Sequence, residues 1–146
     1  MARGRSRQYR RGVVDVARVE AIPALAALPP ALKAGLAEGF DELSVPAGER
    51  VVNQGDFAFE LFVIVEGTAR VEQDGEVVAT IGPGELCGEI GLLLTGRRTA
   101  AIVAETPMVV LAMFEQTFRT LCREHPELSE AVHRQSRGRF TRPAAV

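Results

Sequence analysis

Residues 84–104 read Gly-Glu-Leu-Cys-Gly-Glu-Ile-Gly-Leu-Leu-Leu-Thr-Gly-Arg-Arg-Thr-Ala-Ala-Ile-Val-Ala. Gly88 precedes a short apolar run, residues 90–94, which is long enough for one or two helical turns. A glycine at a helix start lets backbone N–H groups approach a ligand closely, and the positive end of the helix dipole favours an anion there. Arg97 and Arg98 follow, and a guanidinium beside that helix start can hold a phosphate through its planar set of donors. The stretch therefore predicts a phosphate-binding segment.

Glu89 is the unexpected residue of this segment, because a carboxylate repels a neighbouring phosphate. It fits if it accepts hydrogen bonds from a neutral group of the same ligand, such as a sugar hydroxyl, while also pairing with an arginine. A ligand with one phosphate charge and a free ribose hydroxyl meets both conditions. The alternative is a plain salt bridge between Glu89 and Arg98 with no ligand involved.

The order Gly88-Glu89-Ile90-Gly91-Leu92, with Arg98-Thr99 beginning nine residues after Glu89, resembles the phosphate-binding cassette of cyclic nucleotide-binding domains. That family includes kinase regulatory subunits, nucleotide-gated channels and catabolite-activator-type transcription factors. One departure is Cys87, since the family more often has a bulky apolar residue before the Gly-Glu pair. The departure concerns local packing rather than the ligand contacts.

The resemblance implies a role for each part of the segment. Arg98 would bind the equatorial oxygens of a cyclic phosphate, and Glu89 would bind the ribose 2′-hydroxyl. Thr99 would add its hydroxyl or N–H group, which requires Arg98 to lie in the loop before the strand, since neighbouring strand residues face opposite ways. The spacing favours Arg98 over Arg97, which is expected to face solvent. The predicted ligand-binding residues are Gly88, Glu89, Ile90, Gly91, Arg98, Thr99 and Ala100.

The period of the apolar residues changes along the chain. Helical spacing at residues 13–39 and again from residue 114 onward predicts helices at both ends, with a break at His125-Pro126. Between them, short apolar runs separated by turn residues predict strands, and Asp74-Gly75 gives the clearest hairpin turn. The predicted strands include residues 61–65, 68–73, 76–81, 99–104 and 109–113.

A second motif extends the resemblance over residues 22–133. It is Gly48-x-x-Val51-Val52-x-x-Gly55-Asp56 followed by Phe62-Val63-Ile64-Val65-Glu66-Gly67, which is similar to the first half of the family's β-roll. The expected fold is mainly β with flanking helices (α+β). It comprises an eight-stranded β-roll or jelly-roll-like barrel with N-terminal helices, a short cassette helix and C-terminal helices.

The charges are divided unevenly along the chain. All 19 acidic residues lie between Asp15 and Glu130, whereas nine of the 17 basic residues lie outside that window. We therefore expect a disordered basic tail at residues 1–12, a cyclic nucleotide-binding domain at 13–137 and a basic C-terminal tail at 138–146. The acidic body argues against nucleic acid as a partner, and contact with one through the basic tails is the minor alternative.

Several functional classes are disfavoured by the sequence. Cys87 and Cys122 lack a metal-ligand pattern and are expected to be free thiols in a reducing compartment. The only histidines, His125 and His133, lie in the C-terminal helical region rather than on strands, which argues against a metal-dependent enzyme on a cupin-like barrel. No apolar run reaches the ~18 residues of a membrane span. We expect no enzyme, no cofactor, no membrane and a cytoplasmic location.

The functional expectation is a stand-alone cyclic nucleotide-binding sensor or regulatory module, with cAMP favoured over cGMP by family frequency alone. Its output would pass to an unknown protein partner or through a homo-oligomer. The alternative is an interaction or scaffold protein on the same fold, whose pocket is empty or holds another effector. Residues Leu128, Ala131 and Val132 are expected to close over the base, to contact another subunit or simply to pack on the roll.

Overall fold

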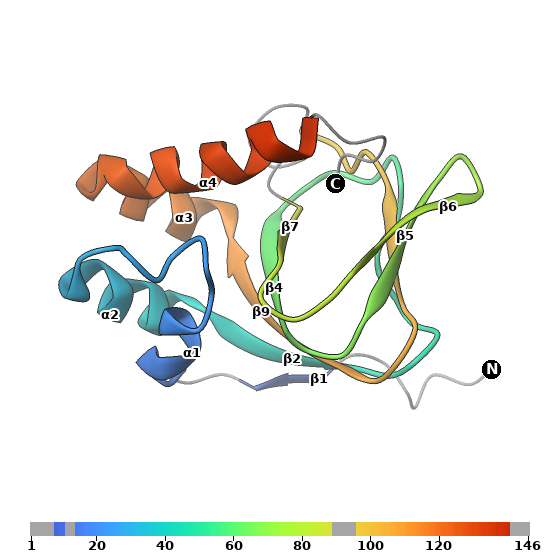
Figure 1. Cartoon of the computed structure of the whole chain (residues 1–146), viewed down its shortest axis with the longest axis horizontal. Coiled ribbons are helices and arrows are strands. Elements are labelled where there is room, and N and C mark those ends of the chain that lie inside the picture. Colours follow the sequence, from blue (N-terminus) through green and yellow to red (C-terminus); the bar gives the residue numbers. More distant parts are fainter. Residues whose placement is uncertain (1–7, 11–13, 89–95, 141–146) are drawn as a thin grey trace.

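The computed structural model describes residues 8–10, 14–88 and 96–140, with the backbone alone at residues 8–10 and 135–140. Within these ranges nine strands form two antiparallel sheets, and four helices gather at one side of them (Figure 1). The strands are Gln8–Arg10 (β1), Asp41–Val45 (β2), Arg50–Val52 (β3), Glu60–Glu66 (β4), Ala69–Gln73 (β5), Glu76–Ile81 (β6), Leu86–Cys87 (β7), Ala101–Ala104 (β8) and Met108–Phe114 (β9). The sheet orders are β1-β2-β9-β4-β7 and β3-β8-β5-β6. Strands β2–β9 form the expected β-roll.

Strand β4 connects the two hydrophobic cores of the molecule. It lies between β9 and β7, and its residues Leu61, Phe62, Val63 and Ile64 are all buried. Since alternate side chains of a strand face opposite ways, Leu61 and Val63 join a core shared with the helices, whereas Phe62 and Ile64 join the core inside the roll. This confirms the predicted strand at residues 61–65 and shows that residues 61–64 are buried on both faces.

The hairpin between β5 and β6 has the turn that the sequence predicts. Asp74 and Gly75 have φ angles of 53° and 82°, and they join the paired residues Gln73 and Glu76. Two consecutive positive φ angles are the requirement of the two-residue turn that matches strand twist, and the Asp-Gly pair favours it.

The helices are Val16–Glu20 (α1), Pro30–Gly39 (α2), Glu115–Glu124 (α3) and Pro126–Phe140 (α4). Helix α2 begins at Pro30, where the missing proline N–H leaves no helical hydrogen bond unmade. His125 lies between α3 and α4, which confirms the predicted break. Leu128, Ala131 and Val132 of α4 are buried in the core that the helices share with β4, so they pack within this chain.

The structure differs from the sequence-based boundaries at both ends. Residues Gln8–Arg10, placed in a disordered tail, pair with β2 as an edge strand, because strand pairing depends on a distant partner rather than on local apolar spacing. Helix α4 continues to Phe140, past the expected domain end. The predicted cassette helix falls within residues 89–95, outside the described part.

Two further expectations concern the cysteines and membrane-spanning segments. Cys87 is buried and Cys122 is half-buried, and neither is in a disulfide. Within the ranges that the structure describes, no helix has the length and apolar character needed to cross a bilayer.

Candidate functional site

Arg98 is held in place through its backbone. Its N–H donates to the Asp56 carbonyl at 2.8 Å, and its own carbonyl accepts from the Gly55 N–H at 2.9 Å. Strand β8 begins only at Ala101, so Arg98 lies in the preceding loop, against the β3–β4 connection. The rule that neighbouring strand residues face opposite ways therefore does not constrain Arg98 and Thr99. The sequence predicts a strand from residue 99, whereas β8 begins at Ala101. The backbone of Arg98 bonds to Gly55 and Asp56 in a loop instead of to a neighbouring strand.

The Arg98 side chain is enclosed by the roll. It is 6% exposed and is the one polar or charged side chain that is buried among the described residues. Its Nη1 donates to the Gly88 carbonyl at 3.2 Å and its Nη2 to the Glu60 carbonyl at 2.7 Å. The guanidinium carbon also lies 5.4 Å from the centre of the Phe62 ring. Two carbonyl dipoles and an aromatic face thus surround a full positive charge.

The electrostatic environment of Arg98 favours an incoming anion. Burial lowers the pKa of the guanidinium by removing it from water, and this effect is partly opposed by the nearby Cys87, Glu60 and Asp56. Among the described residues no carboxylate forms an ion pair with Arg98. A buried charge that has no carboxylate ion pair in the described part of the chain is costly, and a phosphate placed against it would recover part of that cost.

Gly88 allows the close approach of Arg98. Its φ angle is +88°, in the left-handed region that residues with a Cβ rarely adopt. A Cβ at this position would lie 2.6 Å from Arg98 Nη1 and 3.4 Å from the Glu60 carbonyl oxygen. The glycine predicted from the sequence is therefore required for two reasons, its backbone angle and the space beside the guanidinium.

The structure describes four of the seven predicted site residues and places them in different surroundings. Gly88 and Arg98 are in direct contact. Thr99 is half-buried, and its carbonyl accepts from Gln73 Nε2 at 3.0 Å. Ala100 is buried in the core of the roll. Glu89, Ile90 and Gly91 lie outside the described residues.

Sequence reasoning missed several residues around Arg98. Arg98 lines a cavity of about 360 Å³, and Asn53, Asp56, Phe57 and Phe59 are among the other lining residues. Phe57 and Phe59 are 59% and 62% exposed. Their alternation just before an apolar strand suggests buried positions, so the sequence offers no signal that they face solvent.

Arg97 occupies a different environment from its neighbour. Its guanidinium carbon lies 4.1 Å from the centre of the Phe57 ring, and its Nη1 donates to the Gly55 carbonyl at 2.9 Å. The residue is exposed, as the sequence predicts. Arg97 thus stacks on an aromatic ring at the surface, whereas Arg98 is buried.

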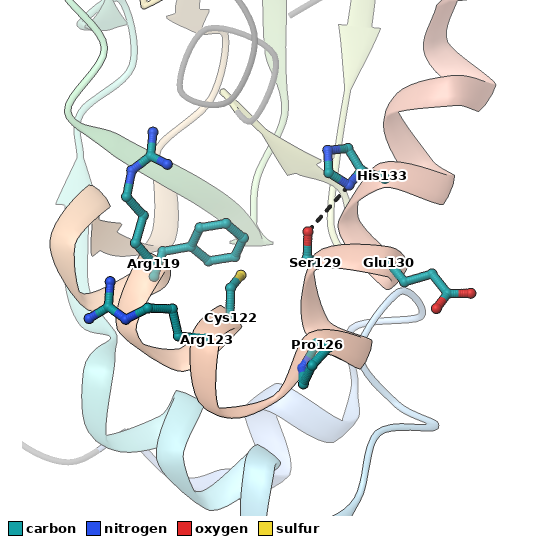
Figure 2. A pocket seen from close by; sticks show the side chains of 8 residues that line it. Arg119, Cys122, Arg123, Pro126, Ser129, Glu130 and His133 are labelled. Atoms are coloured by element: carbon teal, nitrogen blue, oxygen red, sulfur yellow. Dashed lines mark hydrogen bonds between the residues drawn. The ribbon is translucent and has the colours of Figure 1, made fainter.

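A larger cavity, of about 690 Å³, lies between α3 and α4 (Figure 2), and Arg98 is not among its lining residues. Cys122 on α3 faces a pair on α4 in which Ser129 Oγ and His133 Nδ1 are 3.3 Å apart. Burial raises the pKa of the Cys122 thiol, which keeps it protonated and a poor nucleophile. No group of three or more His, Cys, Asp or Glu side chains suited to a metal ion occurs in the described part of the chain.

Comparison with known proteins gives the same family. The family model of the cyclic nucleotide-binding domain matches residues 42–125, more than half of the chain. A cyclic nucleotide-gated potassium channel of Mesorhizobium japonicum is 30% identical over 132 residues, which cover 89% of this chain and 37% of the channel. The cyclic AMP receptor protein of Thermus thermophilus is 33% identical over 92 residues, covering 60% of this chain and 43% of the receptor.

The fold is also found in solved structures. The regulatory subunit of a cAMP-independent protein kinase A from Trypanosoma brucei superimposes with a TM-score of 0.77 at 22% identity, over 84% of this chain and 44% of that chain. This chain thus spans less than half the length of these curated relatives. The buried arginine, the glycine beside it, the β-roll and the matched region agree, and the chain belongs to the family of cyclic nucleotide-binding domains.

Proposed function

We propose that this chain is a sensor or regulatory module that binds a cyclic nucleotide at Arg98, with cAMP preferred over cGMP. The observation that carries the proposal is the buried guanidinium of Arg98, which has carbonyl partners and no carboxylate ion pair among the described residues. The cAMP preference is supported by the related receptor from Thermus thermophilus, which is named for cyclic AMP.

The ligand would replace weak partners of Arg98 with a strong one. A cyclic phosphodiester carries a single negative charge, and a guanidinium can donate two parallel N–H bonds to its oxygens. Both Nη atoms of Arg98 now donate to carbonyls, so the phosphate would exchange or share these bonds. In this proposal Glu89 binds the ribose hydroxyl, and the backbone N–H groups of residues 89–91 and Thr99 complete the phosphate site.

The module would work without catalysis and without a cofactor other than its ligand. Domains of this family are regulatory, which fits the proposal. We further propose a cytoplasmic location and an output through a protein partner or a second copy of the chain.

A second candidate function is an interaction module with another effector. It is favoured by the Trypanosoma brucei structure, whose fold is the same although the kinase is described as cAMP-independent. The fold by itself therefore does not determine the ligand. In this case Arg98 would bind a different anion or have only a structural role.

Thermal unfolding with a nucleotide panel separates the two functions. A ligand at ~100 times its Kd stabilises the folded state by ~2.7 kcal/mol, so cAMP at millimolar concentration is expected to raise the Tm clearly. AMP, which carries an open phosphate of higher charge, is the matched control and is expected to have a smaller effect. No Tm shift with millimolar cAMP or cGMP would favour the second function.

A further inference from the structure

The backbone of residues 98 and 99 lies beyond the ends of the strand ladders. Strand β8 pairs with β5 only as far as Glu72 and Ala101, and its pairing with β3 ends at Ile102. Backbone groups that a ladder does not satisfy need other hydrogen-bond partners. Two other parts of the roll supply them here.

The first support is the connection between β3 and β4, and the second is a side chain of β5. The Arg98 N–H donates to the Asp56 carbonyl at 2.8 Å, and the Gly55 N–H donates to the Arg98 carbonyl at 2.9 Å. Gln73 is the last residue of β5, and its Nε2 donates to the Thr99 carbonyl at 3.0 Å. A side-chain amide thus provides a hydrogen bond at the point where strand pairing has ended.

A reciprocal pair of hydrogen bonds joins these two supports. The Asp74 N–H donates to Gln54 Oε1 at 2.9 Å, and Gln54 Nε2 donates to Asp74 Oδ1 at 3.1 Å. Asp74 follows Gln73 in the chain, and Gln54 precedes Gly55. The hydrogen bonds therefore close a ring that runs through the β5–β6 turn, the β3–β4 connection and the backbone of residues 98 and 99.

The bond from Gln73 is the more protected part of this ring. It is part-buried, whereas both bonds between Gln54 and Asp74 are exposed. Val71 lies two residues earlier in β5 and is buried in the core of the roll, so strand alternation places Gln73 on the same inward face. Water replaces a lost donor less easily there than at the surface. The Gln73 amide is therefore expected to matter more than the Gln54 pair.

We propose that Gln73 is a positioning residue for the ligand that binds at Arg98, an inference that rests on the proposed function. Its amide fixes the Thr99 carbonyl, and with it the backbone from which the Arg98 side chain extends into the roll. A guanidinium binds a phosphate through two parallel N–H bonds, and binding is tighter when its position is set in advance. Gln73 acts through Arg98 rather than through the ligand.

Calorimetric titration of the full chain with cAMP tests the effect on binding. Gln73→Met keeps the length of the side chain and removes the donor. It is expected to weaken cAMP binding about threefold to tenfold, the range of one net hydrogen bond. The matched control is Gln116→Met, at an exposed position of α3, which is expected to leave the affinity unchanged. Equal affinity in the wild type and Gln73→Met would overturn the proposal.

Hydrogen exchange of the ligand-free chain separates positioning from other roles of Gln73. The Arg98 N–H is the probe, and the reference is the N–H of Leu111 in β9, which pairs with strands on both sides. Gln73→Met is expected to speed exchange at Arg98 at least fivefold more than at Leu111. Equal acceleration at both would indicate a general loss of stability, and unchanged exchange at Arg98 with weaker binding would indicate direct contact with the ligand. Either result would overturn the proposal.

The two measurements also distinguish this proposal from the proposed function. A wild type that binds neither cAMP nor cGMP would contradict the proposed function, and the exchange ratio would then decide alone whether Gln73 holds the Arg98 backbone. If Gln73→Met does not fold, Gln54→Met opens the same ring from an exposed position. It is expected to speed exchange at Arg98 more than at Leu111, and equal rates at both would contradict the ring.

Discussion

Arginines line both the cavity of the roll site and the cavity between α3 and α4, but these arginines differ in burial and in pairing. The helical cavity is the larger, about 690 Å³ against about 360 Å³. Its Arg119 is exposed, and the Arg119 Nε already donates to Glu115 Oε2 at 2.7 Å. Arg98 of the roll is buried and has only carbonyl hydrogen-bond acceptors among the described residues. Cavity size shows where a ligand fits, whereas a charge removed from water shows where an anion gains free energy.

The largest expected effect is the loss of ligand affinity in Arg98→Gln. Truncating one partner of a buried charge pair costs ~2–5 kcal/mol, so the affinity for cAMP should fall at least thirtyfold. The control Arg97→Gln removes an exposed charge, whose pairs contribute ~0–1 kcal/mol, and should change the affinity by less than about fivefold. Calorimetric titration measures both. Equal affinity in the wild type and Arg98→Gln would remove Arg98 from the site.

A smaller loss is expected from Gly88→Ala. Its left-handed backbone costs a residue with a Cβ about 1–2 kcal/mol, and the new Cβ would lie 2.6 Å from Arg98 Nη1. Gly96→Ala is the matched control, since Gly96 has a φ of +75° but a Cβ added there would meet nothing within 4 Å. Denaturant unfolding should show a loss of stability in both variants, larger in Gly88→Ala because of the contact with Arg98, whereas calorimetry should show weaker cAMP binding in Gly88→Ala alone. Unchanged affinity in Gly88→Ala would mean that the position of Arg98 is not critical.

Changes in the helical cavity should affect ligand binding still less. Arg119→Gln breaks an exposed pair with Glu115 and is expected to cost ~0.3–0.5 kcal/mol of stability. The affinity for cAMP should change less than twofold, as measured by calorimetry. A tenfold loss would instead indicate that the nucleotide lies between α3 and α4.

The smallest effect concerns a paired charge at the surface of the roll. The hydrogen bond from Arg70 to Glu72, 2.6 Å long, is the main cause that lowers the pKa of the Glu72 carboxyl, and Arg50 adds to it. A carboxyl with a lowered pKa in the folded state stabilises the fold above the unfolded pKa of about 4.3, and this contribution is lost as the pH falls through the folded pKa. The denaturant midpoints of the wild type and Glu72→Gln should therefore differ slightly at pH 7 and converge as the pH falls through the lowered folded pKa of Glu72. A constant difference across this range would contradict the pairing.

The sequence predicts the parts of this molecule that depend on local chemistry. Asp74 and Gly75 favour their turn wherever they occur between strands, and Gly88 marks a backbone position that excludes a Cβ. The family resemblance indicated Arg98, but its carbonyl partner at Glu60 and the Phe62 ring belong to a strand whose sequence shows only burial. These contacts come from tertiary packing, and a backbone carbonyl carries no residue-type signal.

Strand β1 has no such local signal. Its residues, Gln8–Arg10, belong to an Arg-rich segment without apolar periodicity. Pairing with Ser44, Leu43 and Glu42 of β2 places them in the sheet, and that pairing depends on an exposed strand edge more than 30 residues away. Nothing in the local sequence reports the presence of such an edge.

The most direct test of the central claim is a crystal structure of the chain with cAMP bound. We expect the cyclic phosphate within hydrogen-bond distance of the Arg98 guanidinium, next to Gly88. A nucleotide bound between α3 and α4, or one in the roll with Arg98 still donating only to the Gly88 and Glu60 carbonyls, would contradict it.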